Sequence, residues 1–214
     1  MERNTAIIEY KGYKMKCFRD SEKALQDTID ELERDTHKYS KLNVRGRVVY
    51  DLGAFYGESA VYFLRRGAQK VVAVEPYDSM NFIAENVGLN GFGEEKVFVC
   101  PYFIADHAGY TRVTEGYTNT PSSRLPGTPI GNSPRNIITL DMLLSVAAFE
   151  GEKVLKIDIE GAECSIIAVS DLSSFEEIVI ETHSIKGFED TFNALNSKGF
   201  SVSGVDQFIY AKKV

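Results

Sequence analysis

The segment VLKIDIEGAE, residues 154–163, carries more charge than a buried strand normally does. Its apolar residues alternate with Lys156, Asp158 and Glu160, and Gly161 ends the run. Burying an unpaired charge is costly, so such groups are usually paired, bound to a ligand or shifted in pKa. The segment therefore predicts a functional group of acids at the end of a buried strand.

The next apolar run, FEEIVIETHS, also ends in polar residues two positions apart. Residues at this spacing share one face of a strand. If the two strands are neighbours, four candidate catalytic residues converge there: Asp158, Glu160, Glu181 and His183. Histidine is the natural proton acceptor near neutral pH. The carboxylates of Asp158, Glu160 and Glu181 are alternatively candidate ligands of a divalent metal, or groups that bind the substrate.

Two charged residues of the same segment have simpler explanations. Glu163 follows the glycine turn and is expected to open a helix, where an acid interacts favourably with the helix dipole. Lys156 shares a strand face with Asp158 and is expected to neutralise one of the neighbouring carboxylates. Both residues are therefore assigned structural roles.

The elements that position these residues have the pattern of an α/β domain. From about residue 45, apolar runs such as GRVVYDLG and KVVAVEP alternate with amphipathic segments such as ESAVYFLRRG. This alternation indicates a mostly parallel sheet with helices on both faces. We expect residues 45–214 to form the domain and residues 1–44 to add an N-terminal hairpin and helix, within a single compact unit.

Residues 109–136 interrupt the alternation and are rich in Gly, Pro, Ser, Thr and Asn. We expect a hairpin arm followed by a long loop, and long loops in compact domains often serve as lids. Tyr117 and Arg124 in this insertion are candidate substrate contacts, because closure of a lid would bring them over the sheet edge.

Composition narrows the classes of partner. The net charge of −7 argues against a nucleic acid or an anionic membrane, which require a positive surface. The three cysteines lie far apart and form no CxxC pair, which favours free thiols over a disulfide framework. No apolar run approaches the roughly 18 residues of a membrane span. We expect a cytoplasmic protein, and composition gives no oligomeric state.

The first strand of the domain ends in DLGAFYGE, a turn typical of nucleotide-type sites. Gly53 permits a sharp turn, and Gly57 lets the next helix begin close to a ligand. Glu75 ends the second strand 22 positions after Gly53, and Pro76 closes that strand. An acid at an offset of about 20 residues binds ribose hydroxyls in dinucleotide folds. The two motifs predict a ligand of adenosine type.

The turn itself limits which adenosine ligand it can bind. The dinucleotide fingerprint G-x-G-x-x-G is absent, since positions 55 and 58 are Phe and Glu. Asp51 beside the turn would repel a pyrophosphate. These features suit a ligand that lacks phosphates and carries a cationic end, and S-adenosylmethionine has both properties.

The sequence resembles the FkbM-type family of class I S-adenosylmethionine-dependent methyltransferases over about residues 48–183. The resemblance rests on DLGAFYGE, on VEP followed by ENVGLNG, and on ADHAG, ITLDMLL and LKIDIEGAE. It implies a Rossmann-like class I methyltransferase fold. Such a fold has a mostly parallel seven-stranded sheet, helices on both faces and an antiparallel last strand.

The resemblance also implies a set of cofactor contacts. Glu75 would bind the ribose hydroxyls, Asp106 would lie near the adenine, and the glycine turn would face the methionine part. Two positions depart from the family pattern, since Phe55 replaces a usual Asn and Phe103 replaces a small residue. The complete set of implied cofactor residues is Asp51, Gly53, Ala54, Phe55, Gly57, Glu75, Pro76 and Asp106.

The expected function is methyl transfer from S-adenosylmethionine to a hydroxyl of a small polar or sugar-like acceptor. Such an in-line reaction needs alignment of the reacting groups and removal of a proton. One alternative is a dinucleotide-dependent oxidoreductase, which the missing fingerprint disfavours. Another is a non-catalytic S-adenosylmethionine-binding protein, which Phe55 and Phe103 keep open. Which of the candidate residues removes the proton, and whether a divalent metal takes part, are left open by the sequence.

Overall fold

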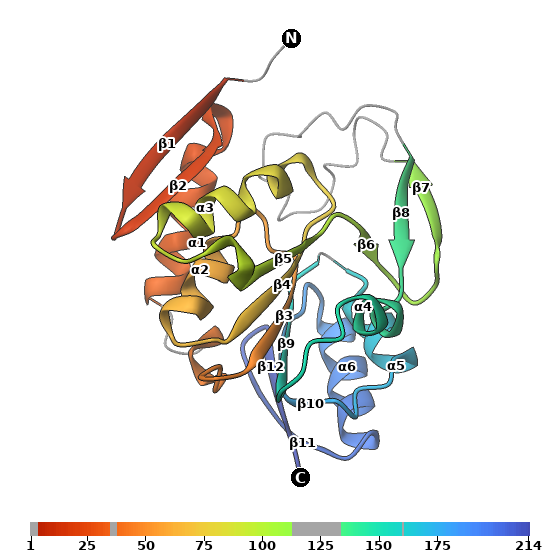
Figure 1. Cartoon of the computed structure of the whole chain (residues 1–214). Coiled ribbons are helices and arrows are strands. Elements are labelled where there is room, and N and C mark those ends of the chain that lie inside the picture. Colours follow the sequence, from red (N-terminus) through yellow and green to blue (C-terminus); the bar gives the residue numbers. More distant parts are fainter. Residues whose placement is uncertain (1–3, 35–37, 113–133, 160) are drawn as a thin grey trace.

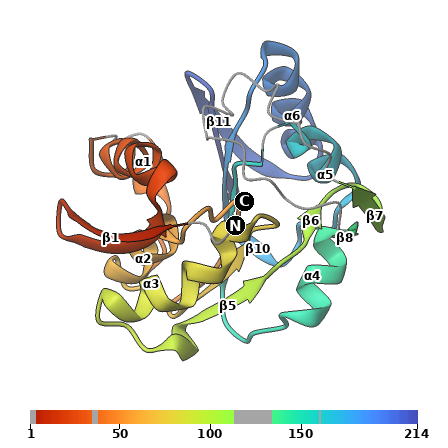
Figure 2. The same cartoon turned by 90° about the horizontal axis from the view of Figure 1, so that it is seen from above.

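A seven-stranded sheet forms the centre of the molecule, with helices on both faces (Figure 1). The computed structural model describes residues 4–34, 38–112, 134–159 and 161–214. Viewed from above, α1, α2 and α3 lie on one side of the sheet, and α4, α5 and α6 lie on the other (Figure 2). The layered α/β architecture expected from the alternating pattern is confirmed.

The strand order of the central sheet is β11-β12-β10-β9-β3-β4-β5. Neighbouring strands from β10 to β5 are parallel, and β12 is antiparallel to both β10 and β11. This confirms the mostly parallel sheet and the antiparallel last strand. The strands are β3 (Val48–Leu52), β4 (Lys70–Val74), β5 (Val97–Cys100), β9 (Lys153–Ile157), β10 (Phe175–Glu181), β11 (Phe200–Val205) and β12 (Phe208–Lys213).

Six α-helices accompany the sheet in the described residues. They are α1 (Glu22–Arg34), α2 (Glu58–Arg65), α3 (Ile83–Leu89), α4 (Leu140–Val146), α5 (Glu163–Val169) and α6 (Ile185–Ser197). Short 3₁₀ turns complete the connections at Arg19–Ser21, Tyr39–Lys41, Asp78–Phe82 and Glu94–Lys96.

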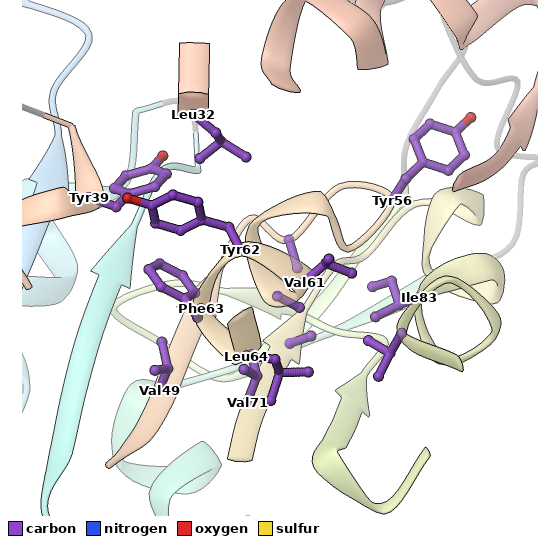
Figure 3. Packing of buried hydrophobic residues seen from close by; sticks show 14 of the residues in the cluster. Leu32, Tyr39, Val49, Tyr56, Val61, Tyr62, Phe63, Leu64, Val71 and Ile83 are labelled. Atoms are coloured by element: carbon purple, nitrogen blue, oxygen red, sulfur yellow. The ribbon is translucent and has the colours of Figure 1, made fainter. Parts of the chain in front are cut away.

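The sheet separates two apolar cores because successive strand residues point to opposite faces. Val49 and Val71 pack toward α2 with Phe63 and Ile83, as Figure 3 shows, whereas Val48 belongs to the core on the other face. Each fully buried side chain of this size contributes about 1.5–3 kcal/mol. The two cores therefore hold the strand ends, and the residues that follow them, in fixed positions.

The N-terminal hairpin is fixed to the domain by two asparagines of the ENVGLNG motif. Strands β1 (Thr5–Tyr10) and β2 (Tyr13–Phe18) pair around Lys11-Gly12 and form a hairpin. Asn86 accepts from the Lys16 backbone N–H at 2.6 Å and donates to the carbonyls of Lys16 and Tyr56. Asn90 makes equivalent contacts with the backbone of Lys14. The hairpin is thereby joined to the turn after β3.

A second, three-stranded sheet has the order β6-β8-β7. Its strands are β6 (Phe103–Ile104), β7 (Gly109–Arg112) and β8 (Pro134–Ile138). The antiparallel pairing of β7 with β8 gives the expected hairpin arm, whose second strand ends two residues beyond the expected insertion. Tyr117 and Arg124 lie outside the described residues. In the described part of the chain, no helix has both the length and the apolar character needed to cross a membrane.

Candidate active site

The turn between β3 and α2 brings the ends of two strands into contact. Gly53 has a φ of +87°, and a Cβ at this position would collide with the carbonyl oxygen of Asp158. The backbone N–H of Asp158 donates to Leu52 at 3.0 Å. Glycine is therefore required here by both the backbone conformation and the space, and Asp158 lies directly beside the turn.

A buried ion pair supports the turn from below. Asp51 and Lys156 are neighbours in the pairing of β3 with β9, and Lys156 Nζ lies 3.0 Å from Asp51 Oδ1. Ser59 donates to the other carboxylate oxygen at 2.6 Å, and Lys156 also donates to the Gly53 carbonyl at 2.7 Å. Lys156 therefore pairs directly with Asp51, because the strand register places Asp51 next to it, and its charge also acts on Asp158 of its own segment.

Glu75 follows β4, and its carboxylate contacts the turn between β3 and α2. Its carboxylate accepts from the backbone N–H groups of Phe55, at 2.9 Å, and Tyr77, at 2.8 Å. Burial raises the pKa of Glu75 to about 7, although these hydrogen bonds favour the ionised form. The carboxylate is thus held rigidly at the carboxyl edge of the sheet, and it lines the cavity described below.

Phe55 adopts a backbone conformation that is unusual for its residue type. Its φ of +48° lies in the left-handed region, which glycine and asparagine tolerate better than phenylalanine. The ring packs edge-on against Tyr56, with centroids 4.5 Å apart. The position keeps the local geometry for which asparagine is suited, while the side chain is aromatic.

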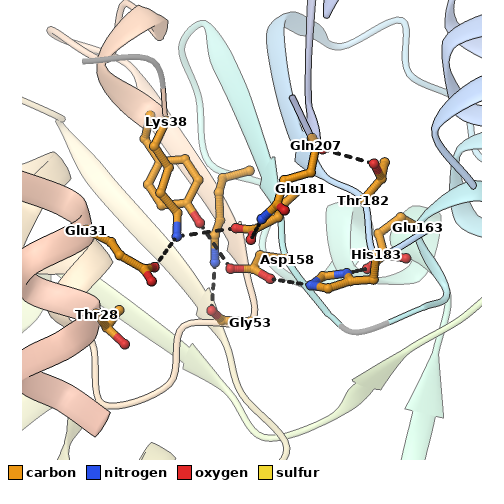
Figure 4. Close-up of polar contacts among 12 residues, drawn as sticks. Thr28, Glu31, Lys38, Gly53, Asp158, Glu163, Glu181, Thr182, His183 and Gln207 are labelled. Atoms are coloured by element: carbon orange, nitrogen blue, oxygen red, sulfur yellow. Dashed lines mark hydrogen bonds and ion pairs between the residues drawn. The ribbon is translucent and has the colours of Figure 1, made fainter. Parts of the chain in front are cut away.

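Asp158, Glu181 and His183 come together because β9 and β10 are neighbours (Figure 4). In the described part of the chain, each offers one ligand atom within 4.8 Å of the others. His183 Nε2 lies 3.7 Å from Asp158 Oδ1, and His183 Nδ1 lies 3.0 Å from Glu163 Oε1. The predicted convergence of these three residues is observed, whereas Glu160 lies outside the described residues.

Glu163 has a second contact that its expected role did not include. It begins α5 as expected, and its Oε1 accepts from the Gly161 backbone N–H at 2.9 Å. The same oxygen contacts His183, so the carboxylate also orients an imidazole. A purely structural assignment of Glu163 was therefore incomplete.

The N-terminal segment contributes two side chains to the cluster. Tyr39 donates to Asp158 Oδ2 at 3.1 Å. Lys38 Nζ lies 3.0 Å from Glu31 on α1 and 3.3 Å from Glu181 (Figure 4). Burial disfavours ionisation of Asp158, but the positive charges of Lys156 and Lys38 hold its pKa below the ordinary value. For Glu181, burial and the charge of Asp158 raise the pKa.

These groups line a cavity of about 1600 Å³ at the carboxyl edge of the sheet. Four of the residues predicted to contact a cofactor border it, namely Gly53, Phe55, Glu75 and Pro76, and so does the Asp158–His183 pair. Its described lining contains three cationic side chains, from Arg34, Lys38 and Lys156, against nine acidic side chains, of which Glu58 has its pKa raised by burial to about 8. The acidic side chains belong to Asp27, Glu31, Glu58, Glu75, Asp158, Glu163, Glu181, Glu189 and Asp206.

Ala54, Gly57 and Asp106, which were also predicted to contact the cofactor, are not among the residues that line this cavity. Ala54 and Gly57 belong to the turn, where Ala54 is fully buried and Gly57 has a φ of +88°. Asp106 does not contribute to the cavity lining described here, and its carboxylate contacts the His107 ring at 2.6 Å. Its predicted place near an adenine stays a prediction.

Comparison with known proteins gives a family and a fold. The family model described as "Methyltransferase FkbM domain" matches residues 51–210. TYW2 of M. jannaschii, solved in complex with AdoMet, is 10% identical, with a TM-score of 0.55 over 100% of this chain and 89% of its own. A putative SAM-dependent methyltransferase from Streptococcus mutans is 7% identical, with a TM-score of 0.52 over 99% of this chain and 55% of its own. A search of the curated proteins gives no match.

Proposed function

Because this chain belongs to the methyltransferase FkbM domain family, we propose that it transfers a methyl group from S-adenosylmethionine to a hydroxyl of a small polar or sugar-like acceptor. One observation carries the proposal. The Gly53 turn and Glu75 border the same cavity as Asp158 and His183, so a cofactor-type site and a proton-accepting site are adjacent.

The residues present fit S-adenosylmethionine. The Glu75 oxygens each accept one backbone N–H and retain acceptor capacity for the ribose hydroxyls. Tyr77 and Phe103 line the cavity as an edge-on aromatic pair, with centroids 5.7 Å apart, and offer an apolar wall to an adenine. The predominantly acidic lining favours the ammonium and sulfonium groups. When bound, this cofactor supplies an electrophilic methyl group on a positively charged sulfur.

Within this proposal, His183 removes the proton of the acceptor hydroxyl. Glu163 contacts Nδ1 and fixes the ring with that nitrogen protonated, so Nε2 is the basic atom and faces Asp158. The acceptor oxygen would bond to the methyl carbon as the carbon–sulfur bond breaks and S-adenosylhomocysteine leaves, and His183 Nε2 would take the hydroxyl proton. The Asp158 carboxylate then stabilises the imidazolium that results.

The lining beyond this pair supports a polar, uncharged acceptor. Thr28, Thr182, Ser184 and Gln207 line the cavity and provide groups that hydrogen-bond sugar hydroxyls. The excess of carboxylates over cations disfavours a phosphate-rich acceptor such as a nucleic acid. A small polyhydroxylated molecule suits both features.

Isothermal titration with S-adenosylhomocysteine tests the cofactor site. The wild type should bind, Glu75→Ala should bind at least tenfold more weakly, and the exposed control Glu94→Ala should match the wild type. Absence of binding to the wild type would refute the proposal, and a thermal shift with NAD instead would favour an oxidoreductase.

Turnover is tested separately with labelled S-adenosylmethionine and fractionated small-molecule extracts. The wild type should label a hydroxyl-bearing compound, and Asp158→Asn should label it far more slowly while it still binds S-adenosylhomocysteine. A wild type that binds the cofactor product but labels no fraction would support a non-catalytic binding protein.

A further inference from the structure

The Lys38 side chain places a buried ammonium between the carboxylates of Glu31 and Glu181. Its side chain is 6% exposed, and its ammonium contacts Glu31 Oε2 at 3.0 Å and Glu181 Oε2 at 3.3 Å. The rings of Tyr39 and Phe208 flank the ammonium at 5.2 and 5.7 Å from their centroids. These contacts come from α1, β10, β12 and the segment after α1, so several elements fix the charge in place.

The cluster beside Lys38 has the composition of a divalent-metal site. Two carboxylates and an imidazole, from Asp158, Glu181 and His183, present ligand atoms within 4.8 Å of one another. Carboxylate oxygens with an imidazole nitrogen suit several divalent cations. The composition of the cluster therefore allows a divalent metal, and the contacts of Lys38 bear on which cation these oxygens bind.

A fixed ammonium at this point opposes a second cation. Lys38 contacts one of the two carboxylates directly, and its charge also acts on Asp158. Two positive charges a few ångströms apart repel each other strongly in a site with little water. Glu31 and Glu181 each place a carboxylate oxygen within 3.3 Å of the Lys38 ammonium, so two acids compensate its buried charge.

We propose that Lys38 is the resident cation of the Asp158–Glu181–His183 cluster, so that the site works without a divalent metal. Lys38 is a positioning residue, which neutralises Glu181 and holds it beside Asp158. It precedes the matched family segment, residues 51–210. The N-terminal segment therefore completes the site. The binding part of this proposal is independent of methyl transfer, whereas metal-free turnover rests on the proposed function.

Titration of the protein with MnCl₂, followed by calorimetry, tests the binding part. The wild type should show no saturable binding, and Lys38→Met should bind Mn²⁺ at least tenfold more tightly, equivalent to about 1.4 kcal/mol. Lys38→Arg, which keeps the charge, should resemble the wild type. Lys41→Met, from the same segment but stacked on Tyr210 at 4.1 Å, is the matched control. Adding Asp158→Asn to Lys38→Met should abolish the gained site.

Two results would overturn the proposal. One is saturable Mn²⁺ binding to the wild type that Asp158→Asn removes. The other is a folded Lys38→Met protein, with unchanged S-adenosylhomocysteine affinity, that gains no Mn²⁺ binding. If Lys38→Met does not fold, Lys38→Gln replaces it with the same expectations.

Metal-free turnover is tested by adding excess EDTA to the wild type, which should leave the rate of methyl transfer unchanged. A rate that falls with EDTA and returns with Mn²⁺ would contradict the proposal. Failure of every preparation to transfer methyl would count against the proposed function alone, because the Mn²⁺ titration decides the position of the cation independently.

Discussion

Removal of the Lys156 ammonium should destabilise the protein more than most single substitutions do. Lys156 is 1% exposed and its partner Asp51 is 0% exposed, with 3.0 Å between Nζ and Oδ1. Lys156→Met would leave the Asp51 carboxylate buried without its counter-charge, a change that costs about 3–5 kcal/mol. Typical total stabilities are about 5–15 kcal/mol. At about 2–4 °C per kcal/mol for a chain of this size, Tm should fall by roughly 6–20 °C.

Urea unfolding followed by circular dichroism measures this cost, and a double-mutant cycle assigns it. If the loss comes from an unpaired Asp51, Lys156→Met combined with Asp51→Asn should recover roughly 2–4 kcal/mol relative to the sum of the single variants. Lys153→Met, at the less buried start of the same strand, should change stability by less than about 0.5 kcal/mol. Additive single and double variants would refute the reasoning, because the two charges would then act independently.

Three further outcomes are expected from the site geometry. Burial raises the pKa of Glu58 from 4.5 to about 8, so the folded protein binds this proton more tightly than the unfolded protein does. The free energy of unfolding, measured with urea, should therefore fall as the pH rises from about 4.5 through about 8. Glu58→Gln should flatten that profile. Phe55→Asn should change the free energy of unfolding by less than about 1 kcal/mol, because relief of the left-handed strain offsets the lost ring packing. Calorimetry should show that this variant binds S-adenosylhomocysteine at least as tightly as the wild type does. Phe55→Ala should destabilise the protein. Glu163→Gln should lower the rate of methyl transfer about tenfold or more and change its pH profile, with S-adenosylhomocysteine affinity unchanged; an unaltered pH profile would contradict its role in orienting His183.

The fold, and the meeting of the glycine turn with Glu75 at one edge of the sheet, could be predicted because their signals are local. Apolar runs gave the strands, and the glycine turn with an acid 22 positions later gave Gly53 and Glu75. The meeting of Asp158 with His183 followed from one further assumption, that two consecutive parallel strands are neighbours, and this assumption is correct. Periodicity and turn chemistry are sufficient for features of this kind.

The charge partners could not be predicted because they depend on register and tertiary packing. Lys156 was expected to pair within its own segment, yet the register of β9 against β3 places Asp51 beside it. Tyr39 contacts Asp158 across 119 positions of sequence, and no pattern near Tyr39 indicates that contact. It depends on how the segment after α1 packs against the end of β9.

Two buried lysines neutralise different carboxylates at the carboxyl edge of the sheet. Lys156 lies under the glycine turn and neutralises Asp51, whereas Lys38 comes from the N-terminal segment and contacts Glu181. Asp158 lies between them, and their combined charge lowers its pKa. In the proposed mechanism, a carboxylate that stays ionised beside His183 is what a proton-accepting imidazole requires, because the imidazolium then forms next to a negative charge. The proposed chemistry of residues 154–163 therefore depends on a lysine more than 100 positions earlier in the chain.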